Sequence, residues 1–190
     1  MSERQSRWDR RHAEAEGIGE PALILGRYGH LLPREGDALD LACGRGASAL
    51  FLARRGLATS AWDLSPVAIE RLRGAAASAG LAIDAQVRDL VARPPRPGSF
   101  DVILVSHFLE RGLAGPLMAA LRPGGLLFYQ TFTRERVGDA GPANPDYRLA
   151  PNELLRLFAP LRLRAYQEEG RLGDLGQGVR DLALYVGERI

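Results

Sequence analysis

The sequence contains no lysine, so its 25 basic residues are all arginines, and 23 acidic residues leave a formal net charge of +2. The pI of about 9.0 therefore reflects cations that titrate only at very high pH in a nearly balanced chain. The arginines are scattered, without the runs of like charge that are typical of nucleic-acid-binding segments. We therefore expect neither a nucleic acid nor a membrane surface as a partner.

Cysteine and long apolar runs are also scarce. Cys43 is the only cysteine, which excludes an internal disulfide, and no Cys/His pair has the spacing of metal ligands. No apolar stretch approaches a length of about 18 residues, which a transmembrane helix requires. The first residues lack the apolar core of a secretory signal. These absences lead us to expect a cytoplasmic protein without a metal site.

Short apolar segments alternate with helical patterns in a chain of 190 residues, 46% of them hydrophobic, which is a composition typical of one globular domain. Five segments read as strands: 38–42, 58–62, 83–87, 100–105 and 126–132. Helices are expected between them, over 47–55, from Pro66 to about Gly80 with Ser65 as N-cap, and over 113–121. Strands that alternate with helices indicate a parallel sheet covered on both faces.

The two ends of the chain differ from this alternation. Residues 133–150 read as a polar loop, and a helix is expected to begin at 151–153. Two strand-like segments, 162–168 and 180–188, close the chain across a short glycine-rich link and are expected to be antiparallel neighbours. Residues 8–28 read as helical. The result is an α/β fold with an antiparallel hairpin at one edge of a parallel sheet.

A glycine turn after the first strand is the main candidate for binding a ligand. Residues 44–49 (GRGASA) satisfy the dinucleotide pattern G-x-G-x-x-G/A, and Asp63 lies about twenty residues further on as a candidate ribose ligand. Asp40, however, precedes the turn, and a carboxylate there is unfavourable beside a pyrophosphate but suits an ammonium or a sulfonium. The chain also has no room for the substrate domain of a dehydrogenase.

Residues 39–46 (LDLACGRG) closely resemble motif I of the class I S-adenosylmethionine (SAM)-dependent methyltransferases. Residues 62–65 (WDLS) resemble motif II, residues 88–90 (RDL) motif III, and residues 100–107 and 122–127 motifs IV and V. Together these matches extend from about residue 36 to 132 in the order of the family. The resemblance implies a Rossmann-like, seven-stranded, mostly parallel sheet and SAM as cofactor, with S-adenosylhomocysteine (SAH) as product.

The resemblance also implies a set of cofactor-binding residues. They are Asp40, Ala42, Cys43, Gly44, Gly46, Asp63, Leu64, Asp89, Leu90 and Ser106. In the family, the acid at Asp63 binds both ribose hydroxyls and the acid at Asp89 binds the adenine amino group. Ala42 replaces the usual first glycine of motif I.

A narrower resemblance is to the tellurite-resistance-type and thiopurine-type small-molecule methyltransferases, through residues 8–12 (WDRRH) and 144–155 (NPDYRLAPNELL). It implies an N-terminal helical lid over 1–35, a SAM-binding core over 36–132, and a substrate-side segment over 133–190. Trp8 is then a candidate substrate contact. His12 stands where that family has an aromatic ring.

His107, at the end of the fourth strand, is the candidate catalytic residue, either as a general base or as a substrate contact. A structural histidine at a strand end is the alternative. An oxygen or nitrogen acceptor often benefits from a base, whereas a thiolate or a selenium or tellurium anion needs none. We expect methyl transfer to a small molecule. The alternatives are methylation of RNA or protein, and a nucleotide-binding module without methyl transfer.

Overall fold

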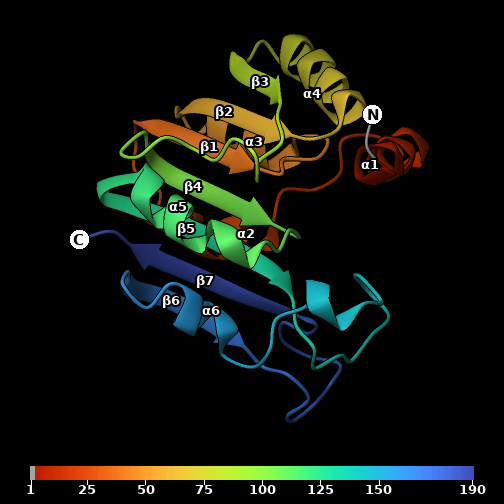
Figure 1. Ribbon diagram of the computed structural model, residues 1–190, viewed down its shortest axis with the longest axis vertical. Helices are drawn as coiled ribbons and strands as arrows, with labels where there is room; N and C mark the ends of the chain where they lie inside the picture. Colours follow the sequence, from red (N-terminus) through yellow and green to blue (C-terminus); the bar gives the residue numbers. More distant parts are fainter. Residues whose placement is uncertain (1–2) are drawn as a thin grey trace.

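The computed structural model describes residues 3–190, which form one seven-stranded sheet with helices on both faces (Figure 1). Residues 1 and 2, where the expected lid begins, lie outside the described part. The strands are β1 Asp37–Leu41, β2 Ala58–Asp63, β3 Ile83–Val87, β4 Phe100–Ser106, β5 Leu121–Phe132, β6 Arg162–Glu168 and β7 Leu182–Glu188. The α-helices are α1 Glu3–Glu14, α2 Leu23–Tyr28, α3 Ala47–Arg54, α4 Pro66–Ser78, α5 Ala114–Ala120 and α6 Glu153–Leu157.

The strand order is β3-β2-β1-β4-β5-β7-β6, with β1 to β5 parallel and β7 antiparallel to both β5 and β6. The expected antiparallel pairing of the last two strands is therefore confirmed, as is the Rossmann-like fold. Because β7 lies between β5 and β6, β6 runs in the same direction as β1 to β5. The carboxyl ends of six strands consequently meet at one edge of the sheet, where α1 also lies (Figure 1).

Alternating side chains along each strand divide the core between the two faces. Leu39 and Leu41 of β1 pack with α5 and α6 on one face, and Ala38 packs with α2 and α3 on the other. A third cluster joins α3 and α4 to β2 and β3. Asp40 therefore projects toward the α3 side of the sheet, as the polar member of an otherwise apolar buried strand. No helix within residues 3–190 has both the length and the apolar character needed to cross a bilayer.

Several expected boundaries were wrong. The helix expected over 8–28 is two helices, since the chain leaves helical geometry at Gly17 and Gly19, which have φ values of +55° and +86°. Strand β5 begins at Leu121 and not at residue 126 as expected, because a register shift opposite the start of β4 accommodates residues 122–125. Strand β7 begins at Leu182 because Asp181 has a φ of +63°.

The polar loop 133–150 is more ordered than its composition suggested. It contains a 3₁₀ turn at Pro145–Tyr147, and Thr133 forms a parallel bridge with Leu149. A second 3₁₀ turn, Arg111–Leu113, precedes α5, which is shorter than the expected helix. The other strands and helices lie within one or two residues of their expected bounds, apart from the short α6.

Candidate active site

The glycine turn reverses the chain between β1 and α3 through three residues with positive φ. Ala42, Gly44 and Gly46 have φ values of +57°, +53° and +88°. A Cβ atom at Gly46 would overlap the side chain of Leu72, so close packing of α4 on the turn requires glycine there. Ala42 holds a left-handed conformation that is strained for any residue with a side chain. The expected turn is therefore confirmed, and its departure from the family pattern carries a local strain.

Asp63, the last residue of β2, links the turn to the next helix. Its Oδ2 accepts a hydrogen bond from the backbone N–H of Gly44 (2.9 Å), and its Oδ1 accepts one from Ser65 (2.9 Å). The two backbone donors fix the plane of the buried carboxylate. Each oxygen retains a second lone pair, which suits a ligand that presents two hydroxyls.

Asp40 is 2% exposed, and its Oδ2 has no hydrogen-bond partner among the described residues. Burial raises the pKa of this carboxyl to about 8, against a hydrogen bond from the backbone of Ala49 that lowers it, while the charge of Asp63 raises it further. A buried, unsatisfied carboxylate oxygen is costly unless a cation or donor meets it. The carboxyl oxygen beside the glycine turn therefore suits a ligand that carries an ammonium.

The backbone of Cys43 helps to fix the turn. Its N–H donates to the carbonyl of Trp62 at 3.1 Å and extends the β1–β2 hydrogen-bond ladder. Burial raises the pKa of its thiol well above the ordinary value, and the charges of Asp40 and Asp63 add to the effect. The thiol therefore stays protonated, although a position before a helix N-terminus can activate a cysteine.

The end of β3 lies beside Asp63, because the backbone N–H of Arg88 donates to its carbonyl at 2.7 Å. Asp89 is exposed, and its Oδ1 accepts from the N–H groups of Val91 (3.0 Å) and Ala92 (3.2 Å), which fixes the carboxylate at the sheet edge. Leu90 is buried beneath it. The structure thus brings together the expected motif residues from the ends of β1, β2 and β3.

His107 follows β4 and has a φ of +54°, a conformation that functional sites use more often than the rest of a fold. Its backbone N–H donates to the carbonyl of Gln130 (2.9 Å), and its ring lies 4.9 Å from that of Phe132. Its Nδ1 is 3.1 Å from Ser106 Oγ, and its Nε2 is 3.4 Å from Gln130 Nε2. His107 is exposed as a residue, but desolvation of its ring lowers the pKa of His107, and the charge of Arg11 lowers it further.

Helix α1 packs over the glycine turn. The ring of His12 contacts Gly44, where an added Cβ would lie 3.3 Å from its Cε1, and it stacks on Trp8 at 5.9 Å. Asp9 accepts a hydrogen bond from the Ser65 hydroxyl. Burial lowers the pKa of His12, the charge of Asp63 opposes this, and Arg45 and Arg11 reinforce it. His12 therefore contacts the turn, although it departs from the aromatic residue of the narrower family pattern.

Sequence reasoning missed Gln130 as part of this site, and it named Asp9 and His12 only within the segment 8–12 that resembles the narrower family. Gln130 carried a usable signal, since it is a polar residue within an apolar run that reads as a buried strand, and it is 1% exposed. The signal for Asp9 and His12 was the resemblance of residues 8–12, which implied a lid without specifying their contacts. Their contacts depend on how α1 docks.

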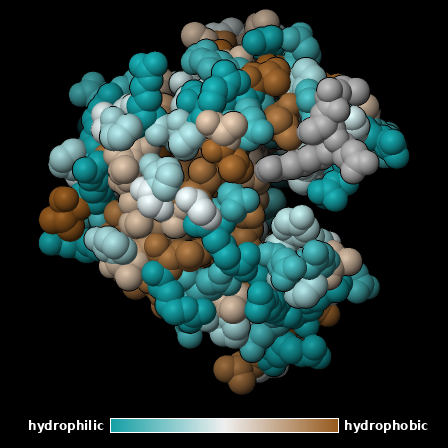
Figure 2. Space-filling view, viewed as in Figure 1, coloured by the Kyte–Doolittle hydropathy of each residue, from teal (hydrophilic) through white to brown (hydrophobic). Residues whose placement is uncertain are grey.

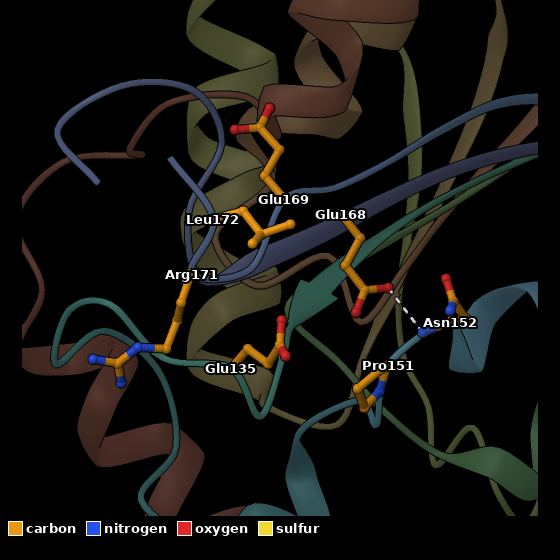
Figure 3. Close-up of a pocket in the computed structure, with 7 residues that line it drawn as sticks. All are labelled: Glu135, Pro151, Asn152, Glu168, Glu169, Arg171 and Leu172. Atoms are coloured by element: carbon orange, nitrogen blue, oxygen red, sulfur yellow. Dashed lines mark hydrogen bonds between the residues drawn. The ribbon is translucent and has the colours of Figure 1, made fainter. Parts of the chain in front are cut away.

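A cavity of about 370 Å³ lies at the same edge of the sheet, beyond the end of β6 (Figure 3). In the wall of this cavity, Glu168 accepts a hydrogen bond from the backbone N–H of Asn152 at 3.1 Å. Strands β4, β5 and β7 separate it from β1 and the glycine turn. The residues that line it are Glu135, Pro151, Asn152, Glu168, Glu169, Arg171 and Leu172. The surface is also indented between the α1 end and the loops after β5 (Figure 2).

Comparisons with known proteins agree with this geometry. The profile of the methyltransferase domain matches residues 38–125. A ubiquinone biosynthesis O-methyltransferase from Methylocella silvestris is 33% identical, over 88% of this chain and 72% of that protein. Other ubiquinone biosynthesis O-methyltransferases match over less than half of their own length.

Solved structures show the same fold. An S-adenosylmethionine-dependent methyltransferase from Mesorhizobium loti has a TM-score of 0.70 at 19% identity, covering 88% of this chain and 98% of that one. TehB from Haemophilus influenzae has a TM-score of 0.70 at 21% identity, covering 88% of this chain and 61% of that one. Identities this low establish the likeness of fold alone.

Proposed function

The chain belongs to the class I SAM-dependent methyltransferases and methylates a small molecule, and from that premise we propose that the atom it methylates is an oxygen. The observation that carries the proposal is the pair Ser106 and His107, which places two hydrogen-bonding side chains at the end of β4. An oxygen acceptor uses such contacts, whereas a soft anion of sulfur, selenium or tellurium does not require them. The curated relative that covers most of this chain is named an O-methyltransferase.

The buried polar groups of the site fit the cofactor. The unsatisfied Oδ2 of Asp40 suits the ammonium of its methionine part, and the fixed carboxylate of Asp63 suits the two ribose hydroxyls. Asp89 and Leu90, with Leu64, would hold the adenine. Ala42, Cys43, Gly44 and Gly46 present backbone to the ligand. We assign these roles as proposals that follow the motif positions.

The cofactor supplies an electrophilic methyl group on a sulfonium, so the protein contributes mainly position and exclusion of water. Helix α1 covers the glycine turn through His12, and Trp8 stacks behind it, which supports residues 1–35 as a lid. His107 and Ser106 would orient the acceptor. Residues 133–190 would form the substrate side, since they follow directly on Phe132, the last residue of β5, which packs on the His107 ring.

The accepting atom can be tested by measuring SAH release from SAM with purified protein. The acceptors to compare are phenols and hydroxyquinolines on one side, and thiols, selenite and tellurite on the other. We expect release with hydroxyl compounds. Release with thiols, selenite or tellurite alone would overturn the oxygen assignment. Binding of SAH and not NAD in calorimetry serves as the control that the site is loaded correctly.

A further inference from the structure

We propose that Gln130 is a positioning residue that holds His107 as a neutral imidazole with its proton on Nδ1, so that His107 orients the Ser106 hydroxyl and does not accept the proton of the substrate. The inference rests on the proposed function in one respect only, namely that Ser106 and His107 face the acceptor. The orientation of Gln130 and the tautomer of His107 follow from contacts within this chain.

The first step is the orientation of the Gln130 amide. The backbone N–H of Ile24, at the start of α2, lies 2.8 Å from Gln130 Oε1 in a buried contact. A backbone N–H can only donate, so the amide atom that faces it must be the oxygen. The amide nitrogen of Gln130 is therefore the atom that faces His107.

The second step assigns the tautomer of His107. Gln130 Nε2 carries hydrogens only, and it lies 3.4 Å from His107 Nε2. Two donors do not pair, so His107 Nε2 must be the unprotonated nitrogen. The proton of the neutral ring is then on Nδ1, which lies 3.1 Å from Ser106 Oγ and donates to it.

His107 is exposed at the sheet edge, and three contacts hold its backbone and ring in this arrangement. The His107 backbone N–H donates to the Gln130 carbonyl, and the ring packs on Phe132. The charged group that acts on the ring is Arg11 of α1, while the side chains against it from β4 and β5 are the neutral Ser106, Gln130 and Phe132. A cation nearby and a donor facing Nε2 both oppose an imidazolium.

The hydrogen bonds therefore run in one direction, from Gln130 to His107 to Ser106. The Ser106 oxygen accepts from His107, so its own O–H proton is available to donate to the acceptor oxygen. The acceptor hydroxyl then loses its proton to water before its oxygen bonds to the methyl carbon and the carbon–sulfur bond breaks. Such a site favours an acidic hydroxyl, such as that of a phenol, over an aliphatic alcohol.

The direct test is ¹⁵N NMR of the histidine side chains in the whole protein, free and with SAH, at pH 7. The chain has three histidines, and loss of one set of signals in His107→Phe assigns the residue. We expect the Nδ1–H tautomer at His107. An Nε2–H tautomer in the unmodified protein would overturn the proposal without any variant or activity measurement.

Two variants sharpen the test. In Gln130→Glu, one oxygen still accepts from Ile24 and the other accepts from His107, so the proton should move to Nε2 and the pKa of His107 should rise by at least one unit. Gln130→Leu should leave a mixture of tautomers. Gln86→Glu, at an exposed amide on β3, is the matched control and should leave His107 unchanged, with His12 and His30 as internal references. An unchanged His107 in folded Gln130→Glu contradicts the proposal.

Activity separates the inference from the proposed function. His107→Asn, whose amide can still donate to Ser106, should retain methyl transfer to within about tenfold, while His107→Phe should lose at least a hundredfold in kcat. If His107 acted as a general base, both variants would lose kcat to the same extent. If no hydroxyl compound is methylated, the proposed acceptor class fails, but the tautomer result stands by itself.

Discussion

At the scale of single residues, Asp40 combines burial with an oxygen that has no partner among the described residues, and burial raises its carboxyl pKa to about 8 from an ordinary 3.8. Between these values the folded state keeps a proton that the unfolded chain has lost. Stability conferred by this group therefore falls as pH rises from about 4 to about 8, and it does not recover above that.

Asp40→Asn should remove this titration. The free energy of unfolding of the original protein, measured relative to the variant by denaturant titration, should decrease between pH 5 and pH 8, since other groups titrate alike in both. In addition, SAH binding near pH 7 should release a proton from the original protein and none from the variant, as calorimetry in two buffers would show. Parallel stability profiles would exclude the buried titration.

Asp63 links the turn to α4 and offers two oxygens to a ligand. Asp63→Ala should weaken SAH binding by about 2 kcal/mol or more, the usual loss when charge-assisted hydrogen bonds are removed. Asp84→Ala, which removes an exposed carboxylate from β3, is the control and should bind SAH normally. Unchanged affinity in a folded Asp63→Ala protein would refute the ribose role.

Ala42 has a φ of +57°, and left-handed geometry costs a residue with a side chain about 1–2 kcal/mol. Ala42→Gly should therefore stabilise the protein by about 0.5–1 kcal/mol, after the greater flexibility of glycine in the unfolded chain is subtracted. Ala38→Gly, within strand β1 just before the turn, should instead destabilise. Thermal unfolding of the two variants would decide, and a loss of stability in both would contradict the strain at Ala42.

At the scale of elements, the docking of α1 determines what covers the glycine turn. Arg71 of α4 donates to the carbonyls of Ala13 (2.9 Å) and Ala15 (2.5 Å) at the end of α1, and Arg45 donates to those of Glu16 and Gly17. Arginine is well suited to this, since its fork reaches two carbonyls at once. Two arginines, one from the glycine turn and one from α4, thus hold the end of α1.

Arg71→Gln should loosen α1 and speed the dissociation of SAH by roughly 10–100-fold, as expected from the loss of one hydrogen bond to a charged group. Stopped-flow fluorescence can follow this, because Trp8 lies on α1 itself. Arg73→Gln, which removes an exposed arginine from the same helix, should leave the rate unchanged. Equal rates in both variants would show that α1 does not gate the site.

At the scale of the whole molecule, the loop 133–150 is fixed by Arg148, which is 1% exposed. Its guanidinium donates to the backbone carbonyls of Thr133 (2.9 Å), Pro142 (2.7 Å) and Ala140, and it lies 5.5 Å from the ring centre of Phe132. The loop is therefore folded around one buried cation that backbone oxygens satisfy. Since Phe132 packs on His107, this arrangement continues into the proposed active site.

Arg148→Met should lower the unfolding free energy by about 2–4 kcal/mol, because it leaves buried carbonyls without donors. For a domain of this size that corresponds to a fall in Tm of roughly 5–15 °C. Arg134→Met, which removes an exposed arginine from the same loop, is the control. An unchanged Tm in Arg148→Met would mean that the loop is held by other contacts.

Local patterns in the sequence determined most of the elements and the motif residues. The strand bounds of β2, β3 and β6, the Ser65–Pro66 start of α4 and the glycine turn all follow from hydrophobic runs, caps and glycines that act over a few residues. Asp40, Asp63, Asp89 and His107 lie near or just after the ends of parallel strands, so strand direction alone predicted that they meet at one edge of the sheet. These features are local, or follow from strand direction alone, which is why the residues sufficed to predict them.

Tertiary structure alone decided how these parts meet. The bond that orients Gln130 comes from Ile24, 106 residues earlier in the chain, and no short-range pattern encodes it. No short-range pattern encodes the contact of His12 with the glycine turn or the hydrogen bonds from Arg148 to backbone carbonyls either. The place of β7 between β5 and β6 is likewise a property of the tertiary structure. The sequence by itself determined a SAM-binding fold, while the tertiary contacts decided which nitrogen of His107 carries a proton, because distant donors and acceptors must be brought together before either can constrain the other.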